Sequence, residues 1–371
     1  MQFILQIFTG AYFSQPVGMA AGQICQRLRE VMELIDVSDV ILGWNTDATL
    51  NRVVLDDIHD HGKKAWLWLP VFSEVPSIMK SEPQIGFSGT SYNAAPVAEE
   101  DFTFVCPTSP HNQRIPLALY DRFFQHLPFD GVFLDKIRHG GFAGGLEQGI
   151  GCACERCRDR YLDAGIQLDA MIIRVRKNPA CLLPVARDGI RYQFIDPDVN
   201  RYLTAKAGII TEAVSFLAAE FRKGGLMIGL DVFAPLLSWY VGQDVYSLAE
   251  IADFVKPMLY LRTNAPAGIP FELAAMNDAM GGEPRRTLHA LWGVGEKDST
   301  GCAKAQIKTL SRTKCAVFPG FEINRVPGVC DSDPDYVCAM ARQYADIGMQ
   351  KVILSWNLLG DIGENIRALL E

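Results

Sequence analysis

Three features are scarce in this chain of 371 residues: histidine, positive charge and long apolar runs. There are six histidines, and 35 lysines and arginines stand against 43 acidic residues, which gives a net charge of −8. This balance argues against a nucleic-acid partner, because binding phosphates requires clustered lysine and arginine. No apolar run reaches the roughly 20 residues of a membrane span, so no membrane partner is expected either.

The start of the chain lacks the features of a secretion signal. Residues 1–10, MQFILQIFTG, are apolar but short, and no charged leading segment or small-residue cleavage site accompanies them. We interpret them as a first strand and expect a cytoplasmic protein. Ten cysteines in a chain of this length fall below the density of a disulfide scaffold, so most should be free thiols or metal ligands.

The chain repeats one theme, a short β-branched and aromatic run followed by a loop and a helical stretch. Eight such runs are expected to be strands: 3–8, 39–44, 64–70, 131–135, 226–232, 254–260, 316–321 and 351–356. Strands that alternate with helices pair in parallel, and eight of them close into a barrel. We therefore predict an α/β fold, a single (β/α)8 TIM barrel spanning residues 1–371.

Three connections are longer than such a barrel needs. The segments 73–110, after the third strand, and 140–197, after the fourth, are predicted loop insertions, and two helical runs are expected between the fourth and fifth strands. The connection after the sixth strand, residues 270–311, is also extended. Long segments at the C-terminal ends of barrel strands are usually functional, because barrels of this kind carry their active sites there.

Acidic residues end three of the predicted strands: Asp135 the fourth, Asp231 the fifth and Glu322 the seventh. These ends meet at one mouth of the barrel, where two carboxyl groups can act as acid and as nucleophile or base. A helix cap or an ion pair explains any single one equally well, but three at equivalent places favour catalysis. Our hypothesis gives the two roles to Asp135 and Glu322, and Asp231 tunes or replaces one of them.

Aromatic, amide and basic residues lie near the same strand ends. The candidate substrate-binding residues are Asn45, Trp66, Trp68, Lys136, Arg138, Tyr260, Arg262 and Trp356, and Trp44 and Glu74 lie near them in the sequence. Indole faces stack on sugar rings, and amides and charged groups bind hydroxyls. Trp66 and Trp68 share a face of their strand, so both line the barrel interior or neither does. Ordinary core packing would also explain the tryptophans, and neutralising Asp135 would explain its basic neighbours.

A close set of cysteines follows the fourth strand. Cys152, Cys154 and Cys157 form the pattern Cys-x-Cys-x-x-Cys, and Cys106 precedes that strand. Four thiolates suit a closed tetrahedral zinc site that stabilises structure. Cys181 is the alternative fourth ligand, and three free thiols in a loop are the alternative to any metal. We predict a structural Zn²⁺ bound by Cys106 and the three clustered cysteines, and no organic cofactor.

The central third of the chain resembles known carbohydrate-active barrels. Cys106-Pro-Thr-Ser-Pro, the segment FDGVFLDKIRH at 129–139 and the Cys-x-Cys-x-x-Cys pattern resemble glycoside-hydrolase-like barrels. The cysteine set is similar to the structural zinc cluster of family 42 β-galactosidases. Resemblance to that clan implies an acid/base at Asp135 and a nucleophile at Glu322. Resemblance to the nucleophile strand of α-amylase-type enzymes implies instead the pair Asp135 and Asp231.

These expectations describe a glycoside hydrolase that cleaves a glycoside or oligosaccharide with two carboxyl groups. Its partner would be a carbohydrate, and the sequence leaves a homo-oligomer open. One alternative is a barrel that binds carbohydrate without cleaving it. The other is a different hydrolase or isomerase on the same barrel, for example a metal-assisted one, which would need histidine ligands that are few near the predicted strand ends.

Overall fold

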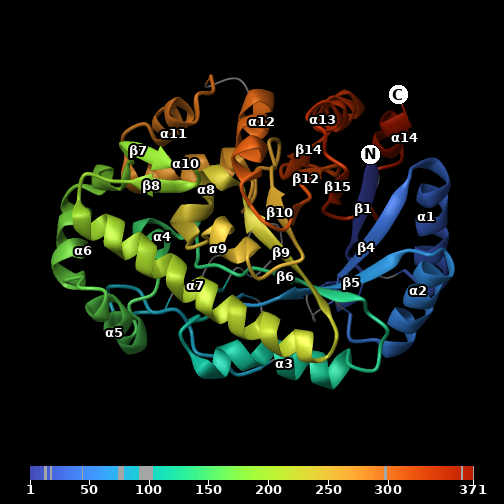
Figure 1. The fold of residues 1–371 in the computed structure, drawn as a ribbon, viewed down its shortest axis with the longest axis horizontal. Coiled ribbons are helices and arrows are strands. Elements are labelled where there is room, and N and C mark those ends of the chain that lie inside the picture. The colour runs from blue at the N-terminus through green and yellow to red at the C-terminus, as the bar shows by residue number, and fades with distance from the viewer. Residues whose placement is uncertain are drawn as a thin grey trace.

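In the computed structural model, eight parallel strands close into a barrel surrounded by helices (Figure 1). The structure describes residues 1–11, 15–16, 19–43, 45–73, 79–91, 103–295, 299–360 and 362–370. Around the ring lie β1 (Gln2–Ile7), β4 (Val37–Gly43), β5 (Lys64–Pro70), β6 (Gly131–Asp135), β9 (Met227–Phe233), β10 (Phe254–Met258), β12 (Gly320–Glu322) and β15 (Lys351–Ser355). A short piece, β11 (Ala316–Val317), pairs with β10 ahead of β12. The predicted TIM barrel is confirmed.

Alternate residues of these strands fill the barrel. The cluster inside the ring contains Ile4, Ile41, Trp66, Trp68, Phe133, Phe254 and Ile353. Trp66 and Trp68 therefore share the interior face, as the period of two in a strand requires. Gly131 makes room for a ring, since a Cβ there would lie 2.5 Å from the indole of Trp66. The interior is a packed core over most of its depth, and only its C-terminal end is left for a site.

Helices cover the outside of the ring (Figure 1). The outer helices are α1 (Ala21–Leu34), α2 (Ala48–Asp60), α3 (Pro110–Phe123), α7 (Pro197–Lys223), α9 (Val245–Ala249), α12 (Ser299–Leu310), α13 (Pro334–Asp346) and α14 (Gly363–Arg367). Side-chain caps set several of their starts: Asp47 accepts hydrogen bonds from the first turn of α2, Ser109 from α3 and Asp196 from α7. None of the described helices is both long and apolar enough to cross a membrane.

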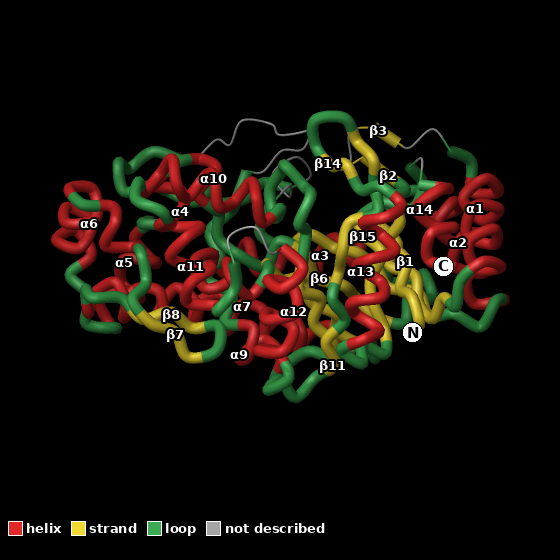
Figure 2. The backbone as a smooth tube through the Cα atoms, turned by 90° about the horizontal axis from the view of Figure 1, so that it is seen from above, coloured by secondary structure: helices red, strands yellow, loops and turns green. Residues whose placement is uncertain are grey.

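The connection after β6 forms a lobe beside the barrel, on the left of Figures 1 and 2. It contains α4 (Leu146–Ile150), α5 (Glu155–Asp163), α6 (Leu168–Lys177) and the antiparallel pair β7 (Ala186–Asp188) and β8 (Arg191–Gln193). With α7 the segment holds four α-helices rather than the two helical runs expected, because α4 and α5 are too short to show a clear apolar period.

Smaller elements decorate the remaining connections. They are β2 (Gly10–Ala11) with β3 (Gln15–Pro16), α8 (Pro235–Ser238), α10 (Ile269–Met280), α11 (Pro284–Trp292), and β13 (Arg325–Val326) with β14 (Cys330–Asp331). Figure 2 shows β2, β3 and β14 at one end of the barrel, with β11 and the N-terminus toward the other. The first of these ends is the C-terminal mouth, where the strand-end residues gather.

Candidate active site

A pocket of about 260 Å³ lies at the C-terminal mouth of the barrel. Its walls are largely aromatic and apolar, and four charged side chains converge on it. The described lining residues are Phe8, Trp68, Asp135, Lys136, Arg138, Asp231, Met258, Tyr260, Thr263, Ala265, Pro266, Ala267, Val326, Val329, Trp356 and Asn357. Apolar walls with a few converging polar groups are the usual make-up of a small-molecule site.

Asp135, the last residue of β6, presents a well-supported carboxyl group to the pocket. Its Oδ2 accepts a hydrogen bond of 2.9 Å from the indole Nε1–H of Trp68. Its Oδ1 accepts the backbone N–H of Lys136, a residue with a left-handed φ of 53°. These two hydrogen bonds fix the orientation of the Asp135 carboxyl group at the pocket wall.

Asp231, in β9, is the second acid of the pocket, and its surroundings differ. Its Oδ2 accepts a hydrogen bond of 3.0 Å from Lys256, whereas the buried Oδ1 has no partner among the described residues. Burial raises the pKa of Asp231 to about 7, although the neighbouring charge of Lys256 acts to lower it. Asp231 can therefore carry a proton near neutral pH, as a general acid must.

Lys256 of β10 is a fully buried cation below the pocket. Its Nζ donates to Gln6 Oε1 at 2.8 Å, to Asp231 Oδ2 at 3.0 Å and to Tyr260 Oη at 2.8 Å. Those bonds match the three protons of an ammonium group. Gly320 makes space for it, since a Cβ there would lie 2.3 Å from Lys256 Cε. Lys256 thus holds one oxygen of Asp231 in place.

Glu322, at the end of β12, is buried but is not among the described residues that line the pocket. Its Oε1 accepts the backbone N–H of Arg262, and its Oε2 accepts the hydroxyl of Tyr336 at 3.1 Å. Burial raises the pKa of Glu322 to about 7. Both oxygens are used within the protein, where they link β12 to the loop after β10 and to α13. The structure brings Asp135 and Asp231 together in the pocket, and Glu322 lies apart.

Five of the predicted substrate-binding residues line the pocket. They are Trp68, Lys136, Arg138, Tyr260 and Trp356. Trp68 packs edge-on against Phe8, with ring centroids 5.7 Å apart, and both rings belong to the pocket wall. Aromatic side chains therefore form part of the pocket wall at the mouth.

Three others do not reach the pocket lining. Trp66 lies deeper, where its Nε1 donates to Asp39 at 3.1 Å. Arg262 pairs with Asp333, and Asn45 donates to the backbone carbonyl of Thr9 at 3.0 Å. Trp44 and Glu74 lie outside the described residues.

Sequence reasoning missed several parts of the site. Lys256 and Gln6 lie outside the set of residues predicted from the sequence, although a polar residue inside an otherwise apolar strand is a usable signal of a buried network. Thr263 and residues 265–267 belong to a loop whose path no strand pattern predicts. Phe8 ends the first predicted strand, and the strand pattern alone does not place its ring in the pocket wall.

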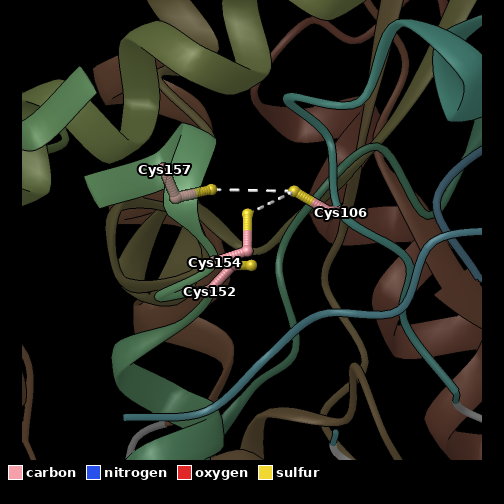
Figure 3. Close-up of side chains that lie close together, drawn as sticks. All are labelled: Cys106, Cys152, Cys154 and Cys157. Atoms are coloured by element: carbon pink, nitrogen blue, oxygen red, sulfur yellow. Dashed lines mark hydrogen bonds between the residues drawn. The ribbon is translucent and has the colours of Figure 1, made fainter. Parts of the chain in front are cut away.

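The four cysteines predicted to bind zinc form a single cluster (Figure 3). The sulfur atoms of Cys106, Cys152, Cys154 and Cys157 all lie within 4.8 Å of one another. Cys106 Sγ is 3.5 Å from that of Cys154 and 3.7 Å from that of Cys157. A tetrahedral zinc ion with bonds of about 2.3 Å places its sulfur ligands roughly 3.8 Å apart, so the donor set fits this ion.

The surroundings of the cluster also suit a metal. The backbone N–H of Ile85 donates to Cys152 Sγ at 3.4 Å, a contact that stabilises a thiolate ligand. Hydrogen bonds with Cys106, Cys152 and Cys157 lower the pKa of Cys154. The pKa of Cys157 is instead raised by its own hydrogen bonds with the other three cysteines. Four thiols this close cannot all ionise without a cation. Cys181, the alternative ligand, is not part of the cluster.

No protein-family model matches this sequence, and no curated protein matches it either. Among solved structures, the chain is similar to the PgaB (BpsB) glycoside hydrolase domain from Bordetella bronchiseptica, with a TM-score of 0.60 and 15% identity over 99% of this chain and 97% of that one. It is also similar to the catalytic domain of β-amylase from Paenibacillus polymyxa, with a TM-score of 0.53 and 11% identity over 98% and 94% of the two chains. These likenesses show a shared barrel fold.

Proposed function

We propose that this protein is a glycoside hydrolase whose two catalytic carboxyl groups are Asp135 and Asp231. The observation that carries the proposal is their placement in one aromatic-walled pocket, in contrasting environments. Asp135 accepts two hydrogen bonds, and Asp231 has a buried oxygen without a described partner. Pairs of acids held in different environments are how glycosidases divide the acid and base roles.

The contacts suggest a division of labour. Asp231 donates its proton to the glycosidic oxygen as the bond to the leaving group breaks. Asp135 acts on the anomeric carbon, either directly as nucleophile or as the base that removes a proton from the attacking water. Lys256 is a positioning residue, because it fixes Oδ2 of Asp231 and leaves Oδ1 to carry the proton. Trp68 orients Asp135 and, with Trp356, offers a surface for a sugar ring.

The structural neighbours support this function without fixing a substrate. One is described as a glycoside hydrolase domain and the other as the catalytic domain of a β-amylase, and each matches nearly the whole chain. Barrels host many chemistries, so the argument depends on the pocket. The pair on strands β6 and β9 is the one implied by the α-amylase-type resemblance. Glu322 is a structural acid in this proposal, because it is not among the described residues that line the pocket and its carboxyl group links β12 to Arg262 and Tyr336.

We also infer that the cysteine cluster binds a structural Zn²⁺. Cys106 comes from the segment before α3, and the other three ligands surround the start of α5. The two insertions also meet where Ala153 N–H donates to the carbonyl of Ile85 at 2.7 Å. A metal there would tie the connection after β5 to the connection after β6. Its site is closed by four protein ligands, which is typical of structural zinc.

The test is turnover by matched variants. Wild type is assayed on a panel of nitrophenyl α- and β-glycosides and for release of reducing ends from polysaccharides. Asp135→Asn and Asp231→Asn should each lose at least about a thousandfold in kcat/KM, as expected for loss of a nucleophile or acid. Asp39→Asn is the control, because Asp39 is also a buried acid bonded to a tryptophan inside the barrel, but at the end away from the pocket.

The control should keep kcat/KM within about tenfold of wild type even where its melting temperature falls. Near-normal turnover in a folded Asp135→Asn protein would refute the assignment of that residue. Saccharide binding without turnover on any member of the panel would instead favour a carbohydrate-binding barrel.

A further inference from the structure

Arg138 is a buried guanidinium in the pocket wall that forms no ion pair with a described residue. Only 4% of its surface is exposed, and it lines the pocket three residues after Asp135. Its Cζ lies 4.2 Å from the ring centroid of Phe233 and 4.6 Å from that of Phe104. The guanidinium lies over the faces of both aromatic rings, which hold it in place.

The hydrogen-bonding capacity of this group is mostly unused. Its Nη1 donates to the backbone carbonyl of His139 at 3.0 Å. Among the described residues, this is the one hydrogen bond that the Arg138 side chain makes. A guanidinium has five N–H donors. Burial lowers the pKa of Arg138 to about 10, so the group remains charged at neutral pH. Glu272, Asp135 and Asp231 influence it only through space.

A buried cation that lacks a bonded counterion is costly for a fold to keep. A ligand anion in the pocket would complete its hydrogen bonds. The walls next to it are apolar and aromatic, as a sugar ring requires, and Lys136 adds a second basic residue to the lining. A planar carboxylate matches the guanidinium fork with two parallel hydrogen bonds, and one guanidinium balances one negative charge.

We propose that Arg138 recognises a carboxylate on the substrate, so that the pocket takes a sugar acid such as a uronic acid residue. This inference rests on the proposed function and narrows its substrate class. Arg138 then determines specificity, and Asp135 and Asp231 remain the catalytic pair. The competing explanation is that Arg138 acts only on those two acids, by stabilising their charge.

Binding separates these explanations without requiring turnover. Isothermal titration of wild type with D-glucuronate and D-galacturonate is compared with D-glucose and D-galactose. We expect a sugar acid to bind at least about tenfold more tightly than its neutral counterpart, since charge-assisted bidentate bonds are strong. Equal affinity for the acid and neutral member of both pairs overturns the proposal, whatever the turnover assays give.

Variants locate the preference. Arg138→Gln should abolish the preference for sugar acids over neutral sugars. Arg138→Lys keeps the positive charge but loses the paired guanidinium donors, so it should retain only part of that preference. Arg187→Gln is the control: Arg187 also lies over an aromatic ring, that of Trp292 at 4.1 Å, but outside the pocket lining. It should leave the preference unchanged. Melting curves verify folding, and Arg138→Lys serves if Arg138→Gln does not fold.

Two results count against the proposal. A preference for sugar acids that survives in both folded Arg138 variants assigns the carboxylate to another residue. A pH–rate profile that shifts in Arg138→Lys, with no change in the ratio of affinities for acid and neutral sugars, shows that Arg138 acts only through the catalytic acids. If sugar acids bind preferentially but no tested uronide is cleaved, carboxylate recognition by Arg138 is supported and the proposed glycoside hydrolase function is refuted.

Discussion

Replacing Lys256 by methionine tests how the protein controls the proton on Asp231. Lys256 is fully buried and satisfies three acceptors at once, Gln6, Asp231 and Tyr260. Methionine has a similar length and no charge, so the substitution removes the cation while it keeps most of the packing. If Asp231 is the general acid, the pH at which activity is lost should change.

The direction follows from the role of Asp231. A general acid works in its protonated form, so activity is lost as the pH rises through its pKa, which burial raises to about 7. Lys256 lowers that pKa, and removing it should therefore move the alkaline limb of the profile to higher pH. A pair 3.0 Å apart interacts with on the order of 5 kcal/mol at an effective dielectric constant of about 20. Structural relaxation and water entry reduce this energy, and we expect the alkaline limb to move up by at least about one pH unit, which corresponds to roughly 1.4 kcal/mol.

The assay is the pH dependence of kcat for wild type and Lys256→Met, with melting curves at each pH. Lys206→Met is the matched control, because Lys206 is equally buried and donates to two backbone carbonyls, but lies outside the pocket lining. Both variants should lose stability, by about 3–5 kcal/mol for the ion pair of Lys256. Only Lys256→Met should move the alkaline limb. An unmoved limb in the folded variant would refute the assignment of Asp231 as the acid.

Three further predictions address the other acids and the metal. Burial raises the pKa of Glu322 to about 7. The protonated side chain therefore contributes its full stability below the pKa of the unfolded state, and this stability is lost as the pH rises toward the folded pKa. Glu322→Gln removes this titration and should flatten the fall in melting temperature between about pH 5 and pH 7. Trp68→Phe removes one hydrogen bond to Asp135 and should lower kcat about tenfold with little change in fold, as kinetics and circular dichroism can check. Purified protein should contain one zinc by metal analysis, and Cys154→Ser or chelation should lower the melting temperature, whereas Cys181→Ser should not.

The barrel could be predicted from the sequence because its evidence is local. Each strand is a short β-branched or aromatic run, and eight such runs separated by helices leave few topologies. The cysteine cluster was equally accessible, since three of its ligands are within six residues, 152–157, and the fourth precedes the same strand. What the sequence could not provide was the direction of each strand-end side chain, which depends on the loops that pack over it.

Glu322 and Asp231 illustrate this limit. Both are acids at or near the C-terminal ends of strands, and nothing in their flanking residues separates them. The difference arises from partners distant in the sequence. Tyr336 on α13 and the backbone of Arg262 bind the carboxyl group of Glu322, while Lys256 binds only one oxygen of Asp231. Asp231 lines the pocket and Glu322 is not among the described lining residues, and that distinction exists only in three dimensions.

Trp66 and Trp68 show how depth in a barrel separates structure from function. Each indole donates to an aspartate on a neighbouring strand, Trp66 to Asp39 of β4 and Trp68 to Asp135 of β6. Burial acts to raise the pKa of Asp39, but hydrogen bonds from Lys351 and its other neighbours lower it, so this ion pair stabilises the closed end of the barrel. Trp68 lies two positions further along β5 than Trp66, and its partner Asp135 lies at the mouth of the barrel. There the carboxyl group of Asp135 lines the pocket and can act on a substrate.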